Sequence, residues 1–193
     1  MQKILIASQN VNKIAQIAPV LKEAGYEVTD ARSFNLPEPV EDSGTFIGNA
    51  RIKAKAACEA TGMAVLADDS GLVMNELKDF PGVETAPYAK ECGGYPNAVK
   101  DIFQRLAGRP ANCYYMAVLL VMFPDGREII ATGKVHGCLL EEARGESNFG
   151  YDPWFEVPEL GKTFAELAQE EILAISHRGH ALQDLLRQLK GAA

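Results

Sequence analysis

The sequence predicts a mixed α/β fold, in which one sheet holds both parallel and antiparallel strands. Apolar, β-rich runs alternate with helical patterns over residues 3–107, an order typical of parallel strands joined by helices. A long hairpin pattern follows over residues 113–139, and hairpin strands are antiparallel. The two observations together favour a mixed sheet over a doubly wound parallel one.

The composition is that of one compact globular domain, which we expect to cover residues 1–193. Hydrophobic residues make up 47% and charged residues 23% of the 193, ordinary values for a protein with a core. The net charge of −7 leaves no excess of Lys and Arg, which argues against nucleic-acid and anionic-membrane partners. A small phosphorylated ligand needs only a few local cations and is not excluded.

Two further features indicate a cytoplasmic protein. The four cysteines are far apart and form no Cys-x-x-Cys pair, which predicts buried free thiols in a reducing compartment. The start of the chain turns polar too early for a signal peptide, and the longest apolar run, residues 116–123, is far shorter than a membrane span.

The first elements follow from apolar spacing and helix-end signals. Residues 3–8 form an apolar run that predicts a buried strand. Residues 10–24 have helical spacing, although the interior Pro19 weakens that prediction because proline removes a backbone donor. Residues 45–61 are Ala-rich and open with a threonine, so they predict a helix.

The later elements are predicted in the same way. Residues 64–67 read as a short strand that ends in a turn, and residues 71–77 read as a second strand after it. Residues 97–107 look helical. The hairpin turns at Pro-Asp-Gly. Residues 176–189 open with a serine and carry leucines on one face, which predicts an amphipathic helix.

The polar stretch that follows the first strand is the first candidate for chemistry. It supplies hydroxyl, amide and ammonium groups at the start of a helix, where backbone N–H groups favour an anion: Ser8, Gln9, Asn10, Val11, Asn12 and Lys13. The alternative is an ordinary helix cap by Asn10, with Lys13 in solvent.

Two adjacent carboxylates, Asp68 and Asp69, follow the apolar residues 64–67. Mg²⁺ prefers hard oxygen ligands, commonly one or two carboxylates together with substrate phosphates. A divalent ion would also remove the repulsion between two like charges. The alternative is a solvated turn.

Upstream, Glu41 precedes a helix that carries Asn49 and Lys53 on one face. The alternative for this polar pair is that it forms the solvent-exposed (wet) side of the helix.

Aromatic residues surround an Asp-Pro turn at residues 148–155. They suggest a base-stacking pocket with Asp152 as a hydrogen-bond acceptor, whereas the alternative is a loop held by aromatic packing. Near the last helix, His177 is followed by Arg178. A cation at a helix start opposes the helix dipole, which favours a functional reason for the arginine.

Taken in order, these motifs resemble one family, the inosine triphosphate pyrophosphatases, also called non-canonical purine NTP pyrophosphatases or XTP/dITP diphosphatases. The resemblance spans nearly the whole chain. Its motifs are Ser-x-Asn-x-x-Lys (8–13), a Glu before Thr-Phe with downstream Asn and Lys (41–53), Ala-Asp-Asp-Ser-Gly-Leu (67–72), Pro-Gly (81–82), Phe-Gly-Tyr-Asp-Pro (149–153) and Ser-His-Arg (176–178).

The resemblance implies an elongated protein with a long central mixed sheet, flanking helices and two lobes with the active site in the cleft between them. It implies a homodimer. The implied reaction is attack of water on the α-phosphorus of a nucleoside triphosphate (ITP, dITP or XTP), which yields the monophosphate and pyrophosphate and clears deaminated purine nucleotides from the pool.

The resemblance also implies the residue roles. Glu41 and Asp69 would hold Mg²⁺, with Mn²⁺ as a substitute, while Asp69 activates water and Asp68 lies close by. Residues 8–13 and Lys53 would hold the phosphates, with Ser70 near the phosphates or the sugar. The base pocket would be formed by Phe149, Gly150, Tyr151, Asp152, His177 and Arg178.

Two cations of the family pattern are missing here, because an arginine is replaced by Pro87 and a lysine by Ile172. The same reaction on a different or modified nucleotide is therefore one alternative. A nucleotide-binding module without turnover is another. An aspartyl-phosphate type phosphatase is disfavoured, because the position after the first strand holds Ser-Gln-Asn rather than an Asp nucleophile.

Overall fold

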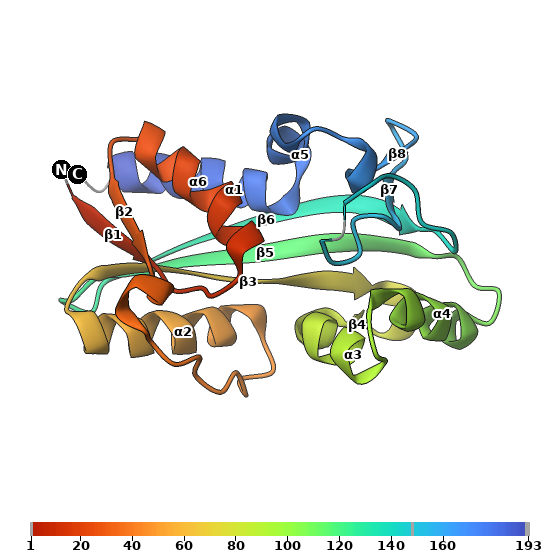
Figure 1. Ribbon diagram of the computed structural model, residues 1–193, viewed down its shortest axis with the longest axis horizontal. Coiled ribbons are helices and arrows are strands. Elements are labelled where there is room, and N and C mark those ends of the chain that lie inside the picture. Colours follow the sequence, from red (N-terminus) through yellow and green to blue (C-terminus); the bar gives the residue numbers. More distant parts are fainter. Residues whose placement is uncertain (1, 148, 192–193) are drawn as a thin grey trace. The chain divides into compact units, whose positions relative to one another are not determined.

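The computed structural model describes residues 2–147 and 149–191. A mixed β-sheet flanked by helices forms its centre (Figure 1), which confirms the predicted fold class. The strands are β1 (Lys3–Ile6), β2 (Glu27–Asp30), β3 (Ala64–Met74), β4 (Phe80–Pro81), β5 (Asn112–Met122), β6 (Glu128–Leu139), β7 (Phe155–Val157) and β8 (Lys162–Thr163). The α-helices are α1 (Val11–Glu23), α2 (Phe46–Thr61), α3 (Thr85–Glu91), α4 (Tyr95–Leu106), α5 (Gln169–Ile175) and α6 (His177–Gly191).

The strand order is β2-β1-β3-β5-β6-β7-β8, with β4 paired to β3. Strand β1 is parallel to both neighbours, with Ile4 opposite Ala64 on β3 and Val28 on β2. The pairs β3–β4, β6–β7 and β7–β8 are antiparallel. The parallel pairing of β1 with β2 and β3 is as the element pattern predicts, whereas the antiparallel pair β3–β4 also lies within residues 3–107 and was not expected.

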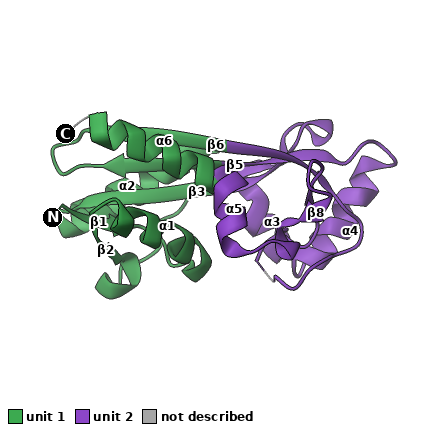
Figure 2. Ribbon diagram, turned by 90° about the horizontal axis from the view of Figure 1, so that it is seen from above, with its two compact units in different colours: residues 1–69, 117–133, 178–193 green, residues 70–116, 134–177 purple. Residues whose placement is uncertain are grey.

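The chain divides into two compact units (Figure 2). Unit 1 comprises residues 1–69, 117–133 and 178–193, and unit 2 comprises residues 70–116 and 134–177. The long strands β3, β5 and β6 contribute residues to both units.

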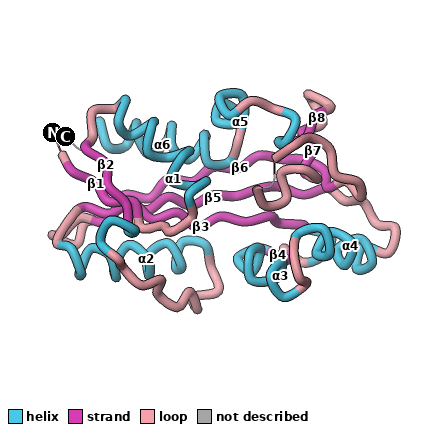
Figure 3. The backbone as a smooth tube through the Cα atoms, viewed as in Figure 1, coloured by secondary structure: helices cyan, strands magenta, loops and turns pink. Residues whose placement is uncertain are grey.

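Unit 1 has helices on both faces of its strands. Helices α1 and α6 cover one face and α2 covers the other, as the backbone trace also shows (Figure 3). Apolar side chains fill the layers between them; those without solvent exposure include Leu5, Ile6, Ile17, Leu21, Ala54, Leu66 and Leu185. An ion pair between Arg51 on α2 and Glu128 on β6, with Nε and Oε1 2.9 Å apart, ties α2 to the hairpin.

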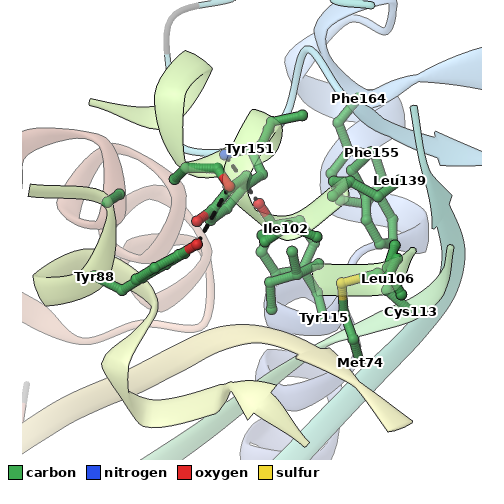
Figure 4. Close-up of a cluster of buried hydrophobic side chains, with 14 of the residues drawn as sticks. Met74, Tyr88, Ile102, Leu106, Cys113, Tyr115, Leu139, Tyr151, Phe155 and Phe164 are labelled. Carbon is green, nitrogen blue, oxygen red and sulfur yellow. Dashed lines mark hydrogen bonds between the residues drawn. The ribbon is translucent and has the colours of Figure 1, made fainter. Parts of the chain in front are cut away.

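Unit 2 is built around a cluster of buried aromatic side chains (Figure 4). Tyr115 on β5 lies 4.7 Å from Phe155 on β7, centroid to centroid, and Phe155 lies 5.0 Å from Phe164. Aliphatic residues from α4 and β3 complete the cluster, among them Ile102, Leu106 and Met74.

The structure corrects the expected strand break at the two aspartates. Strand β3 runs without interruption through Asp68 and Asp69 to Met74, so the predicted turn and second strand are wrong. Apart from the half-buried Ser70, the residues after the aspartates are buried as those before them are, and the strand continues with them. Helix α1 likewise continues through Pro19. Within the described residues, no helix has the length and apolar character needed to cross a membrane.

Candidate active site

The connection from β1 to α1 is organised by Asn10, which caps the helix. Its Oδ1 accepts hydrogen bonds from the backbone N–H groups of Asn12 (3.0 Å) and Lys13 (3.2 Å), and Ser8 Oγ accepts from the N–H of Asn10 (3.1 Å). The cap alternative is therefore right for Asn10. Gln9 donates from Nε2 to the carbonyl of Leu36 (2.9 Å), which ties this connection to the segment before α2.

Lys13 does not extend into solvent as the cap alternative expects. Its side chain is 17% exposed and forms an ion pair with Asp68. Burial lowers the pKa of Lys13, and the neighbouring Asp68 only partly opposes that shift. The ammonium is therefore held inside unit 1, from a residue in the first turn of α1.

Asp68 is fully enclosed and carries two cationic partners. Arg178 Nε donates to Asp68 Oδ2 at 2.9 Å, and Lys13 pairs with the other oxygen, Oδ1. Burial would raise the pKa of Asp68, but Arg178 and Lys13 outweigh it and hold that pKa well below its usual range. The solvated-turn alternative is therefore wrong for this residue.

Gln16 is a member of this network that sequence reasoning missed. Its Oε1 accepts from Arg178 Nη1 at 2.6 Å, and the residue is 8% exposed. A signal was available in the sequence: Gln16 stands between Ile14 and Ile17 on the apolar side of a predicted helix, three residues after Lys13. A polar side chain at such a position needs a buried partner.

Asp69 meets a different cation. Lys53 Nζ lies 2.8 Å from Asp69 Oδ1 and 2.7 Å from Glu41 Oε2, so a single ammonium joins the two carboxylates. Burial raises the pKa of Asp69 to about 6 against the opposing effect of Lys53. Burial alone would lower the pKa of Lys53, but Asp69 and Glu41 outweigh it and raise that pKa. Asp69 Oδ2 is buried and has no hydrogen-bond partner among the described residues.

The geometry of a strand explains why the two aspartates can be neighbours. Successive side chains of a strand point to opposite faces of the sheet. Asp68 pairs with cations from α1 and α6 on one face, whereas Asp69 pairs with Lys53 from α2 on the other (Figure 1). No ion between the two carboxylates is needed to relieve their repulsion.

Helix α2 presents Lys53 because its start is well defined. Thr45 is the N-cap residue, and its Oγ1 accepts from the N–H of Gly48 at 3.1 Å. Asn49, four residues before Lys53, is 4% exposed, and the Lys53 side chain is 12% exposed. The wet-side alternative for this pair is therefore wrong.

The aromatic segment lies in unit 2, where Tyr151 is fully buried. Its backbone N–H donates to Tyr115 Oη at 3.2 Å, and its ring contacts Tyr95 edge-on at 4.9 Å. His177 stacks on Tyr115 at 4.7 Å, and Asp152 is 7% exposed. Burial, with the charge of Asp152, raises the pKa of Tyr115. Aromatic packing thus accounts for Tyr151, while base stacking stays a prediction.

The predicted site residues therefore fall into two groups. Unit 1 brings together Lys13, Glu41, Lys53, Asp68, Asp69 and Arg178. Unit 2 contains Ser70, Phe149, Gly150, Tyr151, Asp152 and His177. In the described part of the chain, no group of three or more His, Cys, Asp and Glu side chains is arranged around a common point that could hold a metal ion.

Comparison with known proteins gives a consistent result. The sequence matches the Ham1 family over residues 4–188. A dITP/XTP pyrophosphatase of Nitrosomonas europaea is 42% identical over 98% of this chain and 95% of its own length. One from Thermus thermophilus is 39% identical over 97% of this chain and 92% of its own length.

Solved structures agree in fold. A HAM1 protein from Coxiella burnetii superposes with a TM-score of 0.90 at 34% identity, covering 99% of this chain and 100% of that chain. The Ham1 protein of Staphylococcus aureus gives a TM-score of 0.88 at 32% identity and covers 100% of both chains. The family match and the full-length likeness confirm the resemblance seen in the motifs: the chain belongs to the Ham1 family.

Proposed function

We propose that the protein is a nucleoside triphosphate pyrophosphatase that hydrolyses dITP, XTP and ITP to the monophosphate and pyrophosphate. The observation that carries the proposal is the charge cluster of unit 1, in which Lys53 joins Glu41 to Asp69 and Lys13 is buried beside Asp68. The names of the relatives, dITP/XTP pyrophosphatases, support it. Phosphoryl transfer depends mostly on positioning and electrostatics, which such a cluster supplies.

The residues fit a divalent cation, and we assign Glu41 and Asp69 as its protein ligands. Mg²⁺ usually binds one or two carboxylates and completes its shell with substrate phosphates and water. Asp69 Oδ2, buried and without a partner among the described residues, has lone pairs available for such an ion. When bound, Mg²⁺ or Mn²⁺ offsets phosphate charge and makes water more acidic.

The remaining roles follow from the charges of the side chains. Asp69, whose pKa is raised to about 6, is ionised at neutral pH and still basic enough to take a proton from the attacking water. Lys53, Lys13 and the polar segment 8–13 bind the triphosphate, the segment through the groups that its own cap hydrogen bonds leave available. Asp68 holds Lys13 and Arg178 in place.

We assign base recognition to Phe149–Asp152 and His177 of unit 2. Arg178, which the resemblance grouped with them, belongs to the Asp68 network of unit 1. Hypoxanthine and xanthine carry a hydrogen-bond acceptor at position 6, where adenine carries a donor. Donors fixed at that position would favour the keto bases and would face the amino group of adenine.

A second candidate is the same reaction on another purine or on a modified nucleotide. Pro87 is an exposed residue of α3, and Ile172 is a buried residue of α5. Neither carries the cation of the family pattern. Loss of two donors would change the choice of base more than the chemistry at the phosphates.

The test is a nucleotide panel with product analysis. Purified protein with Mg²⁺ is incubated with dITP, XTP, ITP, dGTP, dATP and a modified purine triphosphate. We expect pyrophosphate and the monophosphate, released fastest from dITP, XTP and ITP. Orthophosphate would identify a phosphatase, and binding without products would identify a nucleotide-binding module.

We further propose that the protein acts as a homodimer in the cytoplasm. All four cysteines are free, as expected of a protein in a reducing compartment, although only Cys58 and Cys113 are buried and Cys92 and Cys138 are half-buried. Light scattering on the purified protein should give a mass twice that of the 20.9 kDa chain, and a mass of one chain would refute the dimer.

A further inference from the structure

The segment that carries Glu41 has little backbone support. The preceding 3₁₀ helix ends at Phe34 and α2 begins at Phe46. Within this described stretch, residues 37–45 donate no hydrogen bond to another backbone group. The position of the Glu41 carboxylate therefore depends on side-chain contacts.

Ser43, two residues after Glu41, makes most of these contacts. Its backbone N–H donates to Asn49 Oδ1 at 3.2 Å, and its hydroxyl lies 2.8 Å from the same oxygen and 3.0 Å from the Thr45 carbonyl. Ser43 Oγ also accepts from the N–H of Thr45 at 3.2 Å. Asn49 is 4% exposed, so Ser43 is hydrogen-bonded to a buried amide group inside unit 1.

Gly48 gives an independent indication that this contact is close. A Cβ built on Gly48 would lie 2.2 Å from Ser43 Oγ and 2.5 Å from Ser43 Cβ. Any side chain at position 48 would therefore push residue 43 away from the first turn of α2. The serine and the glycine fit one another, and the fit sets how closely the segment approaches the helix.

We propose that Ser43 is a positioning residue, which with Asn49 and Gly48 fixes the segment so that the Glu41 carboxylate stays beside Lys53 and Asp69. The inference rests on the proposed function for the metal role of Glu41. Ligating and catalytic groups act well only when neighbouring hydrogen bonds hold their geometry. Glu41 needs this support because its side chain is 36% exposed, against 10% for Asp69.

The first experiment measures metal binding without turnover. Mn²⁺ is titrated into wild type and Ser43→Ala in the absence of nucleotide, and free Mn²⁺ is followed by electron paramagnetic resonance. We expect binding to weaken about three- to tenfold, the usual net effect of losing one hydrogen bond. In dITP hydrolysis the variant should need more metal but recover a near-normal kcat at saturating Mg²⁺.

Thr61→Ala is the matched control. It removes a hydroxyl from the last residue of α2, at the end of the helix far from Ser43, where it donates to the Ala57 carbonyl at 2.7 Å. A purely structural effect of losing a helix-associated hydroxyl would appear in both variants. We expect Thr61→Ala to bind Mn²⁺ as the wild type does.

The second experiment tests the fit between Ser43 and Gly48. Gly48→Ala should weaken Mn²⁺ binding although the serine hydroxyl is intact. In the Ser43→Gly background two of the three close contacts disappear, since only Thr45 Oγ1 at 2.8 Å remains. The same Gly48→Ala change should therefore cost less there than in the wild type, a non-additivity expected only of residues in contact.

The outcomes separate this inference from the proposed function. A wild type that binds Mn²⁺ but hydrolyses no nucleotide would refute the proposed function, and the Mn²⁺ constants would still decide the role of Ser43. Equal Mn²⁺ affinity of Ser43→Ala and wild type, strictly additive effects of the two substitutions, or a wild type that binds no Mn²⁺ would each overturn the inference.

Discussion

At the residue scale, Asp68 and Asp69 are chain neighbours with opposite electrostatic environments. Asp68 is held ionised by Arg178 and Lys13, whereas burial raises the pKa of Asp69 to about 6. One carboxylate is therefore suited to anchoring cations and the other to accepting a proton. The sequence located both residues but not this difference, because Arg178, a partner of Asp68, lies 110 positions away.

Asp69→Asn keeps the shape of the side chain and removes its charge. The amide loses both metal ligation and proton acceptance, so we expect kcat to fall by about a hundredfold or more. The measurement is dITP hydrolysis with excess Mg²⁺. Asp125→Asn in the hairpin turn serves as control and should retain full activity. A near-normal rate for Asp69→Asn would contradict the assignment.

Asp68→Asn should act on stability as well as on activity. It leaves the buried Arg178 and Lys13 without their counter-charge, a change that typically costs about 3–5 kcal/mol. Urea unfolding at pH 7 measures it, with Asp184→Asn as control. Because the folded-state pKa of Asp68 is lowered from 3.8, its contribution should persist above about pH 4 and disappear as pH falls through the folded-state pKa. A loss below about 1 kcal/mol at pH 7 would show that the network does not stabilise the fold.

At the scale of elements, periodicity and caps located the helices that carry the site. The threonine before α2 and the asparagine before α1 are N-caps, as their positions in the sequence suggested. The length of β3 could not be predicted, because two consecutive aspartates end a strand unless buried cations compensate them on both faces. Those cations come from α1, α2 and α6, which only the tertiary structure brings together.

Helix α5 offers a test of base selection at Ile172. An ammonium there would supply a donor to a keto oxygen or a phosphate, and a charge-assisted hydrogen bond changes selectivity about tenfold or more. We expect Ile172→Lys to raise the ratio of kcat/KM for ITP to that for GTP, whereas Ile172→Met, of similar length without charge, leaves it unchanged. A wild-type ratio already in the thousands would mean that the missing lysine has no bearing on specificity.

At the scale of the whole molecule, an acidic protein binds an anionic substrate. With a net charge of −7, the chain must concentrate its cations locally, and unit 1 does so with Lys13, Lys53 and Arg178. The sequence predicted this cluster through its motifs. The resemblance implied two lobes, but the sequence could not predict which residues form each unit, since each unit is assembled from separated stretches of chain.

Hydrolysis by the intact protein should depend on a divalent metal ion. We expect EDTA to abolish hydrolysis and Mg²⁺ or Mn²⁺ to restore it, because two carboxylates and a triphosphate repel one another without a divalent ion. Activity should rise toward alkaline pH as the attacking water becomes easier to deprotonate. Undiminished hydrolysis in EDTA, measured as pyrophosphate release, would contradict the assignment of Glu41 and Asp69.

Because the two units are made of alternating stretches of the chain, the residues of unit 1 are synthesised at different times. The carboxylate of Asp68 is synthesised early, but Arg178, one of the two cations that compensate it, belongs to the last segment of unit 1 to leave the ribosome. Until then the strand at Asp68 carries a charge that is only partly matched, and its burial is disfavoured. The network around Asp68 is therefore complete only once Arg178 has joined Lys13, although the two cations lie in the last and the first stretch of unit 1.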